Sequence, residues 1–231
     1  MRILALDTST EWCSVAVGEH GSWCVRSERV GQSHSERLLP MVGAALAEAQ
    51  WAVAGLDGIA FGCGPGAFTG IRIGCAVAQG LGLALDRPVL GVPTLEAIAA
   101  EDGGAGVICC LDARMREVYV ATYRRTAAGL AEVAAPAVLA PAAVKPPAGE
   151  PPPGGWVGAG PGFAAYPTLA AGLGLARVNA DALPTAVAIA TLALPRFAAG
   201  RGVPAAQALP LYVRQRVALT SAERAAGAVL S

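Results

Sequence analysis

The amino-acid sequence predicts an α/β fold in two lobes, with the second lobe reduced. Short apolar runs typical of buried strands alternate with longer stretches of helical periodicity. An apolar run closing on Leu-Asp occurs twice, at residues 3–7 and 107–112, each time followed by a polar turn and an alternating strand. Such repetition indicates a duplicated domain, with chance similarity between two buried strands as the alternative. The polar stretch 101–104 marks the boundary between an N-terminal lobe, residues 1–102, and a C-terminal lobe, residues 103–231.

The first lobe opens with three strands joined by short turns, which predicts an antiparallel meander. We expect these strands at residues 2–7, 13–18 and 22–30, and two more at 58–64 and 89–92. Helical periodicity predicts helices at residues 34–49, 69–85 and 94–100. Ser33 and Glu36 have the spacing of a capping box, and Thr69 is a candidate N-cap. Pro40 predicts a kink or a late start of the first helix.

The second lobe shows fewer elements. We expect strands at residues 107–112, 118–123 and 156–160, and helices at 163–169 and 185–199. Thr185 is the candidate N-cap of the last helix. Prolines gather in residues 134–155, which predicts an excursion with little regular structure. The tail at 209–214 is expected to be extended, and the last ten residues to be loose.

Helix 69–85 carries a stripe of small residues. Gly70, Gly74, Ala78 and Gly82 recur every four positions and therefore share one face. A glycine inside a helix costs about 0.5–1 kcal/mol relative to alanine, so this face predicts the close approach of another backbone. A ridge of larger residues lies beside the stripe: Ile73, Val77, Leu81 and Leu85. Whether the neighbour belongs to this chain or to another protein is open at this point.

Helix 34–49 has more apolar residues than one narrow face needs. Its apolar stripe can face the sheet, but an exposed remainder would be a partner site. We therefore expect the two helices to form a platform for a second protein, and a homodimer when the chain is alone. The expected interface residues are Leu38, Leu39, Met41, Val42, Leu46, Gly70, Ile73, Gly74, Val77, Ala78 and Leu81.

Composition and charge exclude several other classes of protein. Hydrophobic residues make up 54% of the 231 residues, which excludes a disordered chain. Seventeen basic residues balance seventeen acidic ones, so nothing indicates that this chain alone holds RNA or DNA. The six cysteines lack the spacing of a zinc site, and we expect reduced, buried thiols. The N-terminus lacks a signal peptide, and the longest apolar stretch falls short of a bilayer span, so a cytoplasmic protein is expected.

Four sequence blocks resemble the bacterial TsaB (YeaZ) family. They are Leu-Asp-Thr-Ser at 6–9, Ser-His-Ser-Glu-Arg-Leu-Leu-Pro at 33–40, the glycine-rich block GPGAFTGIRIG at 64–74, and Pro-Leu-Tyr-Val-Arg at 210–214. The resemblance covers residues 1–123 and returns at the tail. It implies the two-lobed fold shared by actin, Hsp70 and sugar kinases, with mixed sheets flanked by helices.

The resemblance also implies a role. The family is paralogous to TsaD, which transfers a threonylcarbamoyl group to N6 of an adenosine in tRNA. A family member is expected to be the non-catalytic partner that binds TsaD directly, with TsaE joining the complex and tRNA reached only through it. The contact in the family uses the first two helices of the N-terminal lobe, which correspond to residues 34–49 and 69–85.

In the parent fold the first hairpin cradles a nucleotide, and this implies a vestigial cleft here. The corresponding residues are Asp7, Thr8, Ser9, Thr10, Gly64 and Gly66. The alternative is that these polar groups satisfy their own turn. We expect no cofactor in the isolated chain and a nucleotide only in the complex. On the second hairpin, Asp112 with Arg114 and Arg116 resembles a phosphate-binding turn, with a solvated surface turn as the alternative.

Two enzyme hypotheses compete with the partner hypothesis. An ATP-dependent phosphotransferase of the same fold would need a complete pocket in the second lobe and a general base. A glycoprotease-type metallopeptidase would need the H-x-x-x-H pair that holds metal in the catalytic paralogue. Four residues from His34 lie Val30 and Leu38, so that pair is absent and no metal site is expected.

Overall fold

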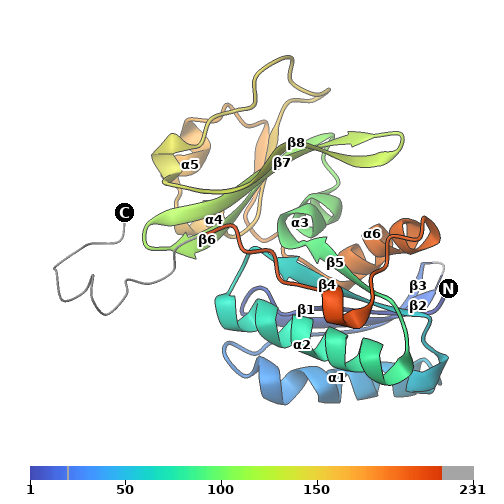
Figure 1. Ribbon diagram of the computed structural model, residues 1–231. Coiled ribbons are helices and arrows are strands. Elements are labelled where there is room, and N and C mark those ends of the chain that lie inside the picture. The colour runs from blue at the N-terminus through green and yellow to red at the C-terminus, as the bar shows by residue number, and fades with distance from the viewer. Residues whose placement is uncertain (20, 215–231) are drawn as a thin grey trace.

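The computed structural model describes residues 1–19 and 21–214 (Figure 1). The first sheet has the strand order β3-β2-β1-β4-β5, and the second has the order β10-β9-β6-β7-β8. The strands of the first sheet are β1 (Ile3–Asp7), β2 (Trp12–Glu19), β3 (Ser22–Arg29), β4 (Gly58–Gly64) and β5 (Val89–Pro93). Those of the second are β6 (Gly106–Arg114), β7 (Glu117–Thr126), β8 (Gly129–Leu139), β9 (Val157–Ala159) and β10 (Arg177–Asn179).

The two sheets share one topology. In the first, β1 pairs antiparallel with β2 and β2 with β3, whereas β1 and β4, and then β4 and β5, pair in parallel. In the second, β6, β7 and β8 form the antiparallel meander, and β9 and β10 follow in parallel. The duplication that the sequence repeat predicts is therefore confirmed. The second lobe is the smaller because β9 and β10 have three residues each.

Helices cover both faces of the first sheet (Figure 1). Helices α1 (His34–Glu48) and α2 (Phe68–Leu85) cover one face, and α6 (Ala186–Ala198) covers the other. Strand β1 shows why: Leu4 and Leu6 point to α1 and α2, while Ile3 and Ala5 point to α6, as alternation along a strand requires. Helix α3 (Thr94–Asp102) packs on the second sheet and lies between the lobes.

The chain returns to the first lobe after the second sheet. Helix α6 packs on β1, β4 and β5, and Val203 pairs with Val89 at the edge of that sheet. Assigning all of residues 103–231 to the C-terminal lobe is therefore wrong for residues 186–208. Where the chain crosses between lobes, Arg177 forms a bidentate ion pair with Asp102 at 2.7 and 2.8 Å, which ties β10 to the end of α3.

Several local expectations were wrong. Strand β8 takes up residues 129–139, so the proline-rich segment 134–155 begins inside a strand and continues into the short 3₁₀ turn η2 (Pro141–Ala143). The helix expected at 163–169 is two single turns, α4 (Gly162–Ala165) and α5 (Thr168–Ala171), because Pro167 interrupts it. Neither Ser33 nor Thr69 caps its helix, whereas Thr185 does cap α6 by accepting from the backbone of Ala188.

Candidate functional site

The small-residue stripe of α2 faces this chain's own first hairpin. A Cβ atom on Gly70 would overlap the carbonyl oxygen of Thr8, and the Thr8 hydroxyl donates to the Gly70 carbonyl at 2.7 Å. Gly74 lies against the Thr8 side chain in the same way. Ala78 is fully buried in the core. These three residues therefore cannot present a surface to another protein, and their expected place in the partner interface is wrong.

Most of the large residues expected in the interface also point inward. Leu38, Met41, Val42 and Leu46 are buried against β1, β2 and β4. Ile73, Val77 and Leu81 are half-buried and pack on the same core. Four of the five interface residues expected on α1 therefore face the sheet, as the alternative interpretation of its apolar stripe predicts. Leu39, which is 53% exposed, is the exception.

The solvent-facing side of the two helices is uncharged in its middle, whereas Glu36, Arg37, Glu48 and Arg72 are exposed toward its ends. No residue between Leu39 and Ala47, or between Ile73 and Leu85, carries a charge. Leu83 is 78% exposed, and Gly43 and Gly80 have no atom within 4 Å of an added Cβ. We call this surface the α1/α2 face; its exposed members are Leu39, Pro40, Gly43, Ala44, Ala47, Ala76, Gly80, Leu83 and Ala84. Sequence periodicity missed it because small residues on both sides of a helix give no apolar contrast.

By length and composition alone, α2 could also cross a membrane. One such helix is weak evidence, because the core helix of a globular domain passes the same test. The glycine side of α2 packs on β1 and on the turn that follows it, which is what a core helix does.

The residues of the expected nucleotide cleft do come together, but around a closed turn. Ser9 donates to Asp7 through its backbone N–H at 3.0 Å and its hydroxyl at 2.9 Å. The Ser9 carbonyl accepts from Ala67 at 2.7 Å, and a Cβ on Gly66 would overlap that carbonyl. Asp7, Thr8 and Ser9 are all buried, and Thr10 is half-buried. Apart from one oxygen of Asp7, the polar groups described here are satisfied within this turn, which leaves no open phosphate cradle at the first hairpin.

Asp7 keeps one carboxylate oxygen without a hydrogen-bond partner. Its Oδ2 lies against Gly62, where any side chain would overlap it, and beside the Cδ1 of Ile189 on α6. Burial raises the pKa of this carboxyl to about 7, although the two hydrogen bonds from Ser9 oppose the shift. The group that the resemblance assigns to the nucleotide cleft is therefore enclosed by the sheet and α6.

A segment near the C-terminus ties the two lobes together. We call residues 209–214 the strap. On the first lobe, the Leu211 N–H donates to the Cys63 carbonyl at 2.7 Å, and the Tyr212 hydroxyl accepts from Arg72 Nε at 2.8 Å. On the second lobe, Arg214 pairs with Glu117 at 2.6 Å and donates to the Ala113 carbonyl at 3.0 Å. The sequence predicts an extended tail here, but not these partners.

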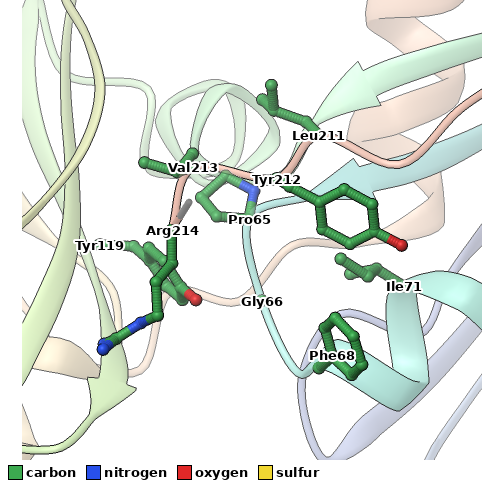
Figure 2. Close-up of a pocket in the computed structure, with 9 residues that line it drawn as sticks. All are labelled: Pro65, Gly66, Phe68, Ile71, Tyr119, Leu211, Tyr212, Val213 and Arg214. Carbon is green, nitrogen blue, oxygen red and sulfur yellow. The ribbon is translucent and has the colours of Figure 1, made fainter. Parts of the chain in front are cut away.

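The strap closes a small cavity between the lobes (Figure 2). The cavity measures about 20 Å³, room for one water molecule. Strap residues Leu211 to Arg214 form one wall, and the other lining residues are Pro65, Gly66, Phe68, Ile71 and Tyr119. Gly64 lies behind it, with Leu211 packed where its side chain would be. The strap therefore occupies part of the space between the lobes.

Replacing Arg214 by alanine should loosen the strap without unfolding either lobe. The variant loses an ion pair and a hydrogen bond to a mostly buried guanidinium, so we expect a cost of about 1–2 kcal/mol. Hydrogen exchange should rise in the strap and at the tip of the β6–β7 hairpin. Arg201→Ala, an exposed arginine in the loop after α6, is the control. If the two variants showed equal hydrogen exchange in the strap and the hairpin tip, the role of Arg214 in joining the lobes would be contradicted.

Nothing in the described residues resembles a metal site or a reactive thiol. No group of three His, Cys, Asp or Glu side chains in that part of the chain could hold an ion. His34 is buried, with its Nε2 3.3 Å from the Trp12 carbonyl, and His20 lies outside the described residues. All six cysteines are free. Burial raises the pKa values of Cys13, Cys63 and Cys110 to about 12, which makes them inert packing residues.

Comparisons with known proteins agree with this architecture. The family model of TsaD, described as tRNA N6-adenosine threonylcarbamoyltransferase, matches residues 25–209. The chain is 38% identical over 223 residues to the tRNA threonylcarbamoyladenosine biosynthesis protein TsaB of Escherichia coli, covering 94% of this chain and 96% of that protein. A protein of the same name from Haemophilus influenzae is 42% identical over 123 residues, 52% of each chain.

A solved structure matches as well. It is YeaZ from Pseudomonas aeruginosa, with a TM-score of 0.83, 41% identity, and coverage of 91% of this chain and 99% of that one. Identity at this level over nearly whole chains, together with the duplicated topology, confirms the expected family: the chain belongs to the TsaB (YeaZ) family.

Proposed function

We propose that this chain is a non-catalytic partner of TsaD, required for transfer of the threonylcarbamoyl group to N6 of adenosine in tRNA. Its relatives carry the name tRNA threonylcarbamoyladenosine biosynthesis protein TsaB, and its lobes match the family model of TsaD itself. On this proposal TsaE joins the complex, tRNA is the substrate of the assembly in the cytoplasm, and a nucleotide binds only in the complex.

The observation that carries the proposal is the α1/α2 face. Two parallel helices present small, uncharged residues to solvent, with Gly43 and Gly80 leaving open space above the backbone. Small residues allow the helices of a partner to approach closely, and Leu39 and Leu83 supply apolar anchors. A paralogue with the same helices would fit as the occupant, and in its absence a second copy of this chain would cover the face.

The enclosure of Asp7 favours a partner over an enzyme. An ATP-dependent phosphotransferase needs a carboxylate that reaches a metal ion and phosphate in an open cleft. Here the Asp7 carboxyl is buried under α6 and the strap occupies part of the space between the lobes. A metallopeptidase would in addition need a ligand cluster, and none occurs in the described ranges.

The test is a charge placed in the middle of the α1/α2 face. Ala76→Glu on α2 and Ala44→Glu on α1 should each weaken binding to the cognate TsaD at least a hundredfold, because the carboxylate would be desolvated without a partner. Isothermal titration calorimetry measures the affinity. Ala198→Glu, an exposed alanine at the end of α6 on the opposite side of the sheet, is the matched control. Unchanged affinity in both test variants would refute the proposal.

A further inference from the structure

Four arginines line up along the strap and the hairpin beside it. Arg72 on α2 donates to Tyr212 of the strap; two residues later Arg214 crosses to the second lobe, where its Nη1 lies 3.2 Å from the Met115 sulfur. Arg114 and Arg116 flank Met115 at the tip of the β6–β7 hairpin. We call Arg72, Arg114, Arg116 and Arg214 the arginine rim. Its members come from α2, the strap and the tip of the β6–β7 hairpin, and Figure 2 shows Arg214 of the strap beside Tyr119.

The rim carries unbalanced positive charge. Arg214 is neutralised by Glu117, and Arg114 pairs with Asp112 at 3.2 Å. Arg72 and Arg116 have no carboxylate partner within residues 1–19 and 21–214. Both are exposed. These two exposed arginines leave a local excess of positive charge that is available to an anionic ligand.

The hairpin tip holds its arginines in a costly backbone conformation. Arg114, Met115 and Arg116 have φ angles of 62°, 54° and 61°, a left-handed run that glycine or asparagine would adopt more easily. Met115 contacts Arg214 and Arg114 pairs with Asp112, whereas the exposed Arg116 has no carboxylate partner among the described residues. Strain kept at an exposed tip that carries charge indicates that the side chains serve a binding role.

Aromatic rings accompany the rim on the first lobe. The Arg72 guanidinium carbon lies 3.7 Å from the Phe68 ring centroid and 5.5 Å from that of Tyr212. The two rings are 43% and 47% exposed, so part of each remains open to solvent. Arginines interleaved with exposed rings form the pattern that binds single-stranded nucleic acid, with guanidinium groups on phosphates and rings under bases.

We propose that the arginine rim contacts the RNA substrate directly, with Arg116, Arg114 and Arg72 on the phosphate backbone and the rings of Phe68 and Tyr212 beside an unpaired base. This inference rests on the proposed role in tRNA modification and adds a direct RNA contact to it. RNA is favoured over an acidic protein because two partly exposed rings accompany Arg72 and offer a surface for stacking bases.

The first test compares two exposed arginines. The full chain is titrated into a fluorescently labelled anticodon stem-loop RNA at several salt concentrations, with anisotropy as the readout. Arg116→Glu should weaken binding about fivefold or more and lower the salt slope by about one. Arg201→Glu makes the same charge change in the loop after α6, where no side-chain partner is described, and should leave binding unchanged. No binding by the wild type, or equal loss in both variants, would overturn the inference.

A second variant separates binding from folding. Arg116→Gly relieves the positive φ and removes the charge, so its melting temperature should rise while its RNA affinity falls. If Arg116 had only a structural role, the melting temperature and the RNA affinity would change in the same direction. That result would contradict the proposed RNA contact. A polyglutamate peptide serves as the acidic-protein probe: if it competes with the RNA at equal charge concentration, the site takes acidic protein and the RNA assignment is wrong.

The outcome is also distinguishable from that of the proposed function. Ala76→Glu on the α1/α2 face should abolish TsaD binding and leave RNA binding by the isolated chain intact. Arg116→Glu should weaken RNA binding and leave TsaD binding intact. Loss of RNA binding in Ala76→Glu would mean that the two surfaces are one, and the rim as a separate site would be refuted.

Discussion

Replacing Gly70 by alanine is expected to destabilise the protein by about 3 kcal/mol, although alanine is the better helix former. The added methyl group would overlap the Thr8 carbonyl oxygen, which is backbone and cannot rotate away. Relief requires α2 to move off β1, and this would break the hydrogen bond from Thr8 to the Gly70 carbonyl. The same argument predicts that bulky residues at Gly74 impair folding before they affect any partner.

Gly80→Ala is the matched control for this prediction. It lies on the same helix, on the α1/α2 face, with no atom within 4 Å of an added Cβ. Alanine there should stabilise the protein by about 0.5–1 kcal/mol. Urea unfolding of the wild type and both variants measures the two effects, which have opposite signs. If Gly70→Ala were neutral or stabilising, the packing of α2 on the first hairpin would be incorrect.

The second large effect should come from Asp7 and should depend on pH. Its pKa is about 7 in the folded protein, against an ordinary value of 3.8, because burial disfavours the charged form. The folded state therefore holds a proton that the unfolded state loses, so stability falls as pH rises from about 4 to about 7. Three pKa units correspond to about 4 kcal/mol. Above pH 7 a buried charge remains, with Oδ2 unpartnered.

Asp7→Asn should remove this penalty. Its side-chain oxygen can still accept from Ser9, but its amide would lack an acceptor, which reduces the gain. We expect the variant to be more stable than the wild type by about 2 kcal/mol at pH 8 and no more stable at pH 4.5. Chemical denaturation at the two pH values measures the difference. Asp181→Asn, an exposed carboxyl, should show no such pH dependence, and a flat profile for both would contradict the buried charge.

Much of the fold could be predicted from the sequence because local patterns determine it. The predicted bounds of β4 agree with the structure at both ends, and those of α1 and α2 to within one residue. The two apolar runs that end in Leu-Asp identified the repeat. In the structure, both sheets have the same strand order. Strand β8 was missed because its alternation is weak and mostly exposed, and β10 because three residues carry too little pattern.

The exposed face of α1 and α2 could be predicted only in part. The stripe from Gly70 to Gly82 correctly indicates a close backbone, but spacing along a helix does not say whose backbone it is. Here Gly70 and Gly74 face Thr8 in the turn after β1 and Gly82 faces Val89 and Ala205, so the outward face is the opposite one, around Ala76 and Gly80. The strap contacts escaped prediction because Arg72 and Tyr212 lie 140 residues apart, beyond the reach of any local pattern.

The strap bonds to both lobes and so restrains their relative angle. Arg177 of β10 forms an ion pair with Asp102 at the end of α3, and Arg214 of the strap forms an ion pair with Glu117 of β7. Enzymes of two lobes use a hinge opposite an open mouth to close over substrate. A segment that bonds to both lobes across the gap opposes such a closing motion. If the chain acts as the proposed partner of TsaD, we expect it to keep a fixed angle between its lobes while any opening and closing takes place in its partners.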